Sequence, residues 1–273
     1  AYFVEPLTKI FIAHLIGIKE VGYFDIAIRV KAQFQGLLTR LLDPFYPYIS
    51  QIKEKIRLKT IVNDIEQKFL LLSLPLIALL IFLLKPLLDL WLGQNNNEEI
   101  TLSSLWITCT FLVTMSVLPM YYFLLSKDHP NKATIINAIT VLVNAALFFI
   151  FFRNYGFYAS VIGLCGSAVA CFMVSLFYQK KFLDTAIFSS AKELSRLLSS
   201  FAILLSSNYL IYHFVENTGL LFTLILSNTL ILSIVSYRYM NLIQKNDIET
   251  YFGKENKLSR FLIKFLVLNQ RES

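Results

Sequence analysis

The feature that most constrains this chain is its series of long apolar segments, such as residues 69–84 and 201–211. About 20 consecutive apolar residues span the hydrocarbon core of a bilayer, where only a helix satisfies its own backbone hydrogen bonds. A membrane β-barrel would need alternating polar and apolar residues, and these segments do not alternate. Charged residues make up 16% of the chain, whereas soluble domains usually have about 25%. We therefore predict an all-α integral membrane protein.

Turn-forming residues such as Gly93 and His129-Pro130-Asn131 divide the apolar sequence. The resulting segments predict about eight transmembrane helices at residues 2–18, 22–48, 69–92, 102–126, 133–152, 157–178, 197–214 and 220–237. We expect three parts: a six-helix transmembrane bundle (1–181), a cytoplasmic linker with a terminal helix pair (182–237), and a basic cytoplasmic tail (238–273).

The basic residues concentrate in alternate connections between these helices. Residues 51–68, 127–132, 179–196 and 238–273 hold five, two, four and seven Lys or Arg residues, eighteen of the chain's 25. Because Lys and Arg are retained in the cytoplasm, both chain ends are expected there. This topology accounts for the net charge of +7 without binding to nucleic acid. Residues 51–68 also contain regularly spaced isoleucines and predict an amphipathic helix on the cytoplasmic membrane face.

Several function classes are disfavoured by what the sequence contains. Its cysteines, Cys109, Cys165 and Cys171, lie in apolar segments and are interpreted as packing residues, with neither disulfide nor metal-site spacing. We find no zinc pair, nucleophile elbow, P-loop or dinucleotide-binding fingerprint, so an enzyme is not expected. The chain begins at Ala1 in apolar sequence without a signal peptide, so we expect an N-terminal part to be missing.

One face of the second segment is polar. At 100° per residue, its polar members lie within about 80° of one another: Asp25, Arg29, Gln33, Gly36, Arg40 and Asp43. Charged side chains in a membrane normally face a wet interior and mark the transported species. Alternatively, Arg29 and Arg40 extend to the two membrane interfaces. Asp25 and Arg29 are spaced to pair, and Lys31, off this face, is interpreted as an interfacial residue.

The first segment also carries charge within its apolar sequence. Glu5 and Lys9 lie one turn apart, with Thr8 beside them and Pro6 able to loosen the helix. Two interpretations remain open. Either Glu5 and Lys9 neutralise each other, or Lys9 faces a substrate.

Several stretches resemble a known transporter family. They are residues 6–17, 20–27 (EVGYFDIA), 44–50 (PFYPYIS), 83–93 (LLKPLLDLWLG) and 154–160 (NYGFYAS). Together they are similar to Wzx-type polysaccharide or O-antigen flippases of the multidrug/oligosaccharidyl-lipid/polysaccharide exporter superfamily. The resemblance extends over residues 6–178, and the last two segments fit the extra helix pair of fourteen-helix members.

This resemblance implies two six-helix bundles around a cavity that opens to alternate sides, with this chain supplying the second bundle and the terminal pair. The cargo would be an undecaprenyl-diphosphate-linked oligosaccharide, and the partners would be membrane lipid and polysaccharide polymerase and chain-length proteins. Substrate-binding residues would be Lys9, Arg29, Gln33 and Arg40. Glu5, Asp25 and Asp43 would take up a coupling proton or sodium ion, and no other cofactor is implied.

Three other functions are compatible with parts of this pattern. A multidrug exporter of the same superfamily would favour aromatic and acidic cavity residues over two arginines. A peptidoglycan-precursor flippase would also use cationic residues. A membrane scaffold would fit if the charged face were only a contact between helices.

Overall fold

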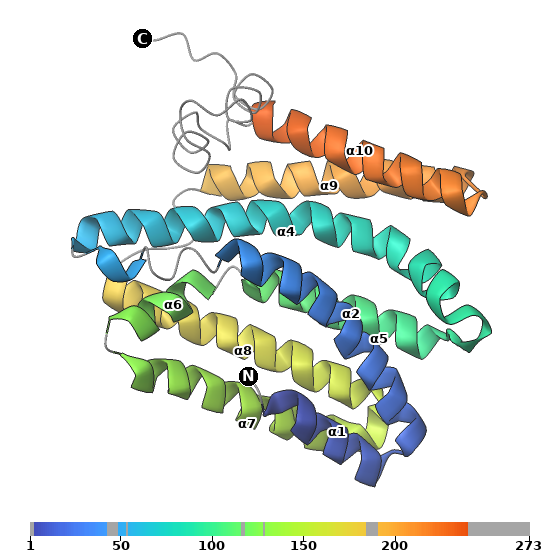
Figure 1. Ribbon diagram of the computed structural model, residues 1–273, viewed down its shortest axis with the longest axis horizontal. Helices are drawn as coiled ribbons and strands as arrows, with labels where there is room; N and C mark the ends of the chain where they lie inside the picture. The colour runs from blue at the N-terminus through green and yellow to red at the C-terminus, as the bar shows by residue number, and fades with distance from the viewer. Residues whose placement is uncertain are drawn as a thin grey trace. The chain divides into compact units, whose positions relative to one another are not determined.

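A computed structural model of the protein describes residues 3–42, 49–52, 54–115, 118–127, 129–183 and 191–239. All regular elements within these residues are helices (Figure 1). They are α1 (Val4–Leu15), α2 (Ile18–Leu42), α4 (Lys55–Leu92), the short 3-10 helix η1 (Gly93–Asn95), α5 (Glu98–Thr114), α6 (Leu118–Ser126), α7 (Pro130–Tyr155), α8 (Tyr158–Leu183), α9 (Ala191–Phe214) and α10 (Thr218–Tyr239). The predicted all-α class is confirmed.

In the residues that the structure describes, each segment expected to cross the membrane is largely helical, and the fourth, residues 102–126, holds two helices, α5 and α6. Residues 43–48 of the second segment lie outside the described residues. In the described residues, α4, α7, α8, α9 and α10 are long and apolar enough to span, and α5 with α6 makes a sixth candidate as a bent pair. The protein is therefore a multi-pass membrane protein. The helix α1 has 12 residues, about 18 Å, which is shorter than the hydrocarbon core of roughly 30 Å. The helix α2 has 25 residues, but six of them are charged.

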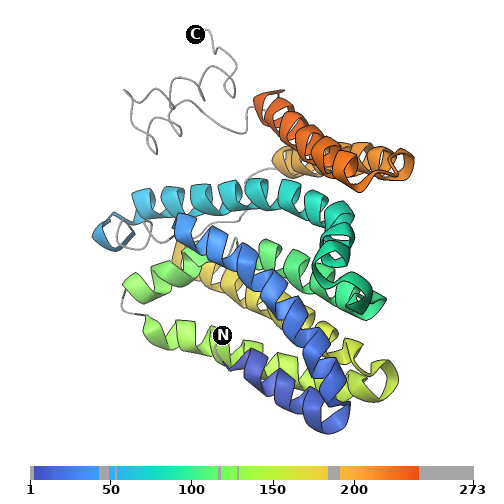
Figure 2. The same cartoon turned by 45° about the vertical axis from the view of Figure 1, so that its right-hand side comes forward.

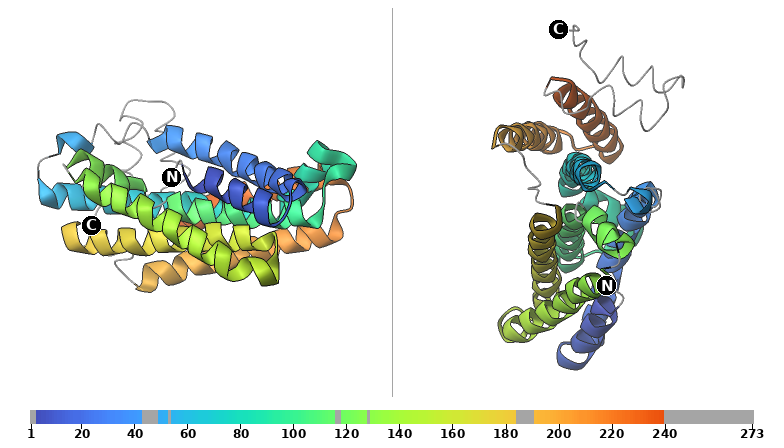
Figure 3. Two further views of the ribbon diagram at one scale, coloured as in Figure 1. Left: turned by 90° about the horizontal axis from the view of Figure 1, so that it is seen from below. Right: turned by 90° about the vertical axis from the view of Figure 1, so that its left-hand side faces the viewer.

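The chain divides into two compact units, Ala1–Leu80 with Leu84–Ser189 and Ile81–Leu83 with Ser190–Ser273. In the first unit, α7 packs along α8, α5 lies against both α2 and α8, and α1 contacts α2 and α7 (Figure 2). Seen along the helix axes, α5 and α8 are neighbours (Figure 3, right). Gly163 permits the close approach of α8 to α7, because an added Cβ would lie 3.0 Å from the Asn144 carbonyl oxygen.

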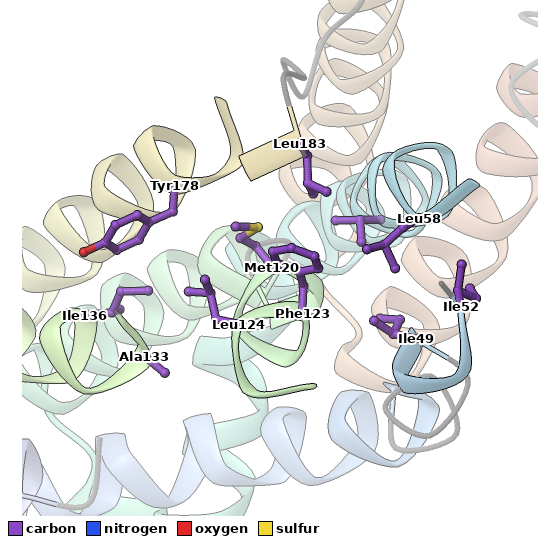
Figure 4. Close-up of a cluster of buried hydrophobic side chains, with 11 residues drawn as sticks. Ile49, Ile52, Leu58, Met120, Phe123, Leu124, Ala133, Ile136, Tyr178 and Leu183 are labelled. Atoms are coloured by element: carbon purple, nitrogen blue, oxygen red, sulfur yellow. The ribbon is translucent and has the colours of Figure 1, made fainter. Parts of the chain in front are cut away.

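Two apolar clusters fill the first unit. One joins α1, α2, α5, α7 and the start of α8 around the fully buried rings of Phe24 and Phe148. The other joins the start of α4 to α6, α7 and the end of α8, and includes Leu58, Met120 and Leu183 (Figure 4).

The predicted separate amphipathic helix at residues 51–68 is wrong. Most of this segment is instead the beginning of α4, a single helix of 38 residues. Its apolar residues Leu58 and Val62 are buried against α6 and α8. The periodicity that suggested contact with a membrane surface therefore reflects contact with protein.

In the second unit, α9 and α10 pack along each other through neutral polar side chains. Asn208 donates to the Thr229 hydroxyl at 2.9 Å, and Asn228 donates to both Ser207 and Asn208 at 2.8 Å. Such hydrogen bonds between helices hold membrane helix pairs together, because lipid offers the same groups no partner.

Candidate functional site

The candidate site is a charged cluster formed by α1 and α2, which meet at a tight turn. The backbone N–H groups of Ile16 and Gly17 both donate to the Ile12 carbonyl oxygen, which ends α1 just before α2 begins. The chain then returns along α1. Lys9 and Asp25 lie eight residues on either side of Gly17 and so face each other across the turn.

Asp25 is the centre of the cluster. Its Oδ1 is 2.5 Å from the Lys9 ammonium, and its Oδ2 accepts a hydrogen bond from Arg29 Nε at 2.7 Å. The predicted pairing of Asp25 with Arg29, four residues apart on one helix, is confirmed. One carboxylate therefore holds two cations from two helices, which reduces their mutual repulsion.

A second ion pair connects the same helices further from the turn. The Lys31 ammonium contacts the Glu5 carboxylate and also lies 5.7 Å from the centre of the Phe111 ring of α5. The Lys31 side chain is only 14% exposed. Its interpretation as an interfacial residue is therefore wrong, because it is held inside the first unit by a carboxylate and an aromatic ring.

Glu5 and Lys9 of α1 do not pair with each other. Glu5 reaches Lys31 and Lys9 reaches Asp25, so both side chains pair with α2. The position of α1 is fixed by a buried polar contact, in which the Thr8 hydroxyl lies 2.9 Å from Asn144 Oδ1 of α7. Thr8 is fully buried and Asn144 is 2% exposed, so this contact constrains where Lys9 can lie.

The remaining polar residues of α2 lie on its exposed side. Arg29 has a side chain that is 68% exposed, and Gln33 and Arg40 are also exposed. Phe24, Ala27 and Leu38, on the other side of the helix, are buried. Asp43 lies outside the described residues, and the assignment of Lys9, Arg29, Gln33, Arg40, Glu5, Asp25 and Asp43 to binding and coupling stays a prediction.

The guanidinium of Arg29 is only partly engaged. Its bond to Asp25 uses Nε, and neither Nη group hydrogen-bonds to the part of the chain that the structure describes. A guanidinium anchored through Nε presents its two Nη groups together, in the geometry that binds a phosphate or carboxylate in bidentate fashion. The site can thus hold an anion without breaking the Asp25 contact.

The sequence did not identify the contacts of two residues in the first unit, Lys31 and Glu66. Lys31 could have been found from its position, because Glu5 and Lys31 lie twelve and fourteen residues on either side of Gly17. Glu66 gave no such signal, because it is surrounded in sequence by the basic residues of 51–68. In the structure it is buried and hydrogen-bonded to Gln179.

Comparison with known proteins gives one match. Residues 1–101 are similar to a family described as "Polysaccharide biosynthesis protein". No curated protein and no solved structure matches the chain. The matched residues include α1, α2 and α4, and therefore the whole charged cluster. The match indicates a polysaccharide-related role for a chain with several helices that are long and apolar enough to cross a membrane.

Proposed function

We propose that this chain is part of a transporter that flips an undecaprenyl-diphosphate-linked oligosaccharide across the bacterial cytoplasmic membrane by alternating access. The observation that supports this most directly is the exposed Arg29 guanidinium, held by Asp25 within residues similar to polysaccharide biosynthesis proteins. Both chain ends would lie in the cytoplasm, where the basic connections are retained.

The cluster has the chemistry to receive the diphosphate. Arg29 offers two Nη groups as donors. The Lys9 ammonium, bound to the same Asp25 carboxylate, places a second positive charge nearby. Charge-assisted hydrogen bonds from a guanidinium to phosphate oxygens are about twice as strong as neutral ones. The lipid diphosphate would therefore bind at the α1–α2 end of the polar face.

The sugar would follow the same face of α2. Gln33 lies one turn beyond Arg29, and Arg40 lies eleven residues beyond it, or roughly 17 Å along the helix. Both are exposed. An amide and a guanidinium at this spacing suit a chain of hydroxyl groups, and drug exporters would have less use for two arginines here.

Coupling would act through the carboxylates of the cluster. A proton or sodium ion on Asp25 would weaken its hold on Lys9 and Arg29, which would then bind the diphosphate more tightly. Glu5 would act on Lys31 in the same way, and Asp43 is the third candidate. Polysaccharide polymerase and chain-length proteins would act on the exported product.

The experiment replaces Arg29 and Arg40 individually by Ala in the complete protein. A hydrogen bond to a charged group contributes about 1.5–3 kcal/mol, so Arg29→Ala should reduce export about tenfold or more. Arg40→Ala should reduce it less, because this residue would contact sugar. Surface polysaccharide, and flipping of lipid-linked oligosaccharide in vesicles, are measured at equal amounts of membrane-inserted protein.

Arg153→Ala is the matched control. Arg153 is an exposed arginine at the end of α7, outside the cluster, and its loss should leave export unchanged. Wild-type export in both the Arg29 and Arg40 variants would refute the assignment of these residues to the substrate path.

A further inference from the structure

Glu66 is a carboxyl group buried in the first unit, away from the charged cluster. Its side chain lies on α4 and accepts a hydrogen bond from the Gln179 amide of α8. Both residues are 1% exposed. A carboxylate at such a position is costly unless a cation or several donors accompany it, and otherwise the group is more stable as a neutral acid.

The charged groups nearest to Glu66 and Gln179 on these two helices are paired with other groups or exposed. Lys59, two turns before Glu66 on α4, has an interaction of its own, and Arg57 is exposed. On α4, Asp64 and Lys68 pair with each other at 2.5 Å. On α8, Lys180 and Lys181 are exposed to solvent. Glu66 forms no ion pair with any basic residue in the described ranges.

The titratable groups of α6 and the turn after it, in the described residues, have contacts of their own, and Tyr122 is one of them. Lys127 donates to the Ile52 carbonyl oxygen at 2.6 Å, and the His129 ring lies 4.8 Å from the Phe182 ring. The Tyr121 hydroxyl accepts from Asn137 at 3.1 Å. Val62, one helical turn before Glu66, and Tyr178, next to Gln179, both belong to the apolar cluster that Figure 4 shows in part.

The surroundings favour a proton over a metal cation as the partner of this carboxyl. A sodium ion needs several oxygen ligands, and membrane sites for it often use carbonyl groups of unwound helices. The helix α4 is continuous from Lys55 to Leu92 and α8 from Tyr158 to Leu183. Their carbonyl groups near Glu66 and Gln179 are thus engaged in helical hydrogen bonds.

We propose that Glu66 is a proton-binding site, which holds a proton while α4 is packed on α8 and releases it when the two helices separate. In the packed state the carboxylic acid accepts the Gln179 N–H through its carbonyl oxygen. On separation, water reaches the carboxyl, the O–H bond breaks, and the proton leaves to solvent with a carboxylate remaining. If the chain transports by alternating access, helix packing and proton uptake are linked at Glu66 during transport. This link to transport rests on the proposed function.

The test is infrared difference spectroscopy of the purified complete protein in lipid bilayers, titrated from mildly acidic to mildly alkaline pH. A protonated carboxyl gives a C=O stretching band that disappears on ionisation. We expect a titrating band that is absent in Glu66→Gln. It should move to higher frequency in Gln179→Leu, because its carbonyl oxygen loses a donor. Glu54→Gln, an exposed carboxyl just before α4, should leave the band unchanged.

The outcomes separate this proposal from the transport function, because no step of the assay requires substrate. A spectrum of Glu66→Gln identical to that of the wild type would overturn the proposal. A Glu66 band that never titrates would also overturn it, since the proton would then be permanent. Should Glu66→Gln fail to accumulate, the frequency shift in Gln179→Leu decides the question, and an unmoved band would contradict the assignment.

Discussion

The helix pairs α1–α2 and α9–α10 are both joined by polar side chains, and the chemistry of the two contacts differs. Between α1 and α2 the contacts are ion pairs whose side chains are 14% to 36% exposed, and one of their carboxylates also holds Arg29 of α2. Between α9 and α10 they are amides and hydroxyls, and Asn208 and Thr229 are 0% and 2% exposed. The amide and hydroxyl groups of α9 and α10 hydrogen-bond to each other within the pair. The charged cluster of α1 and α2 instead leaves the Arg29 Nη groups available to a ligand.

The cost of the two contacts differs as well. A charged residue at the centre of a membrane helix costs about 2.5–3.5 kcal/mol even on the most favourable scale. A neutral hydrogen bond between membrane helices contributes on average about 0.6 kcal/mol. Two membrane helices can therefore be held together by neutral hydrogen bonds, without the cost of burying charges. This contrast favours a functional role for the α1–α2 cluster and a structural role for the α9–α10 contact.

The largest effect is expected from Asp25→Asn in the complete protein. The neutral amide resembles a permanently protonated Asp25, so Lys9 and Arg29 would stay released from it and could not give up a bound diphosphate at the end of the cycle. We expect export to fall about tenfold or more, since two charge-assisted contacts are lost, while membrane insertion is retained. Surface polysaccharide at equal protein level is the measurement.

The control for this variant is Asp89→Asn. Asp89 is an exposed carboxylate near the end of α4 that accepts a hydrogen bond from Asn96. It should export normally. An equal loss of export in Asp25→Asn and Asp89→Asn would show that the effect is not specific to Asp25. The functional role of the α1–α2 cluster would then be refuted.

A smaller effect, on stability, is expected from Lys31→Met. It leaves the Glu5 carboxylate without its cation in a partly buried position, which should lower the free energy of unfolding by about 1–2 kcal/mol. The double variant Glu5→Gln/Lys31→Met should recover most of this loss, because no unpaired charge remains. Unfolding in mixed detergent micelles measures both.

Failure of the double variant to recover stability would show that Lys31 acts through its packing on Phe111. The α1–α2 contact would then resemble α9–α10 more than the ion pairs suggest.

The sequence predicts most of the helices and only part of the site, for a physical reason. Hydropathy is a local property, so the apolar segments coincide with helices, and the Asp25–Arg29 pair follows from helical spacing alone. The pairing of Lys9 with Asp25 depends on how the chain turns at Gly17. The burial of Glu66 depends on α8, more than a hundred residues later. Both are consequences of tertiary packing, which residue spacing within one helix does not contain.

The smallest effect is expected from Asn208→Leu in the α9–α10 contact. It removes the donor to Thr229 and the acceptor for Asn228, and should destabilise the pair by about 1 kcal/mol, within the range of up to roughly 1.7 kcal/mol seen for such bonds. Export per folded molecule should not change. Ser227→Ala is the matched control. Among the described residues, the Ser227 hydroxyl bonds only to the Thr223 carbonyl oxygen of its own helix, so this variant should have no effect on either quantity. A loss of export in Asn208→Leu that exceeds the loss of folded protein would place the α9–α10 contact in the transport cycle. The distinction between a substrate-binding α1–α2 pair and a purely structural α9–α10 pair would then be wrong.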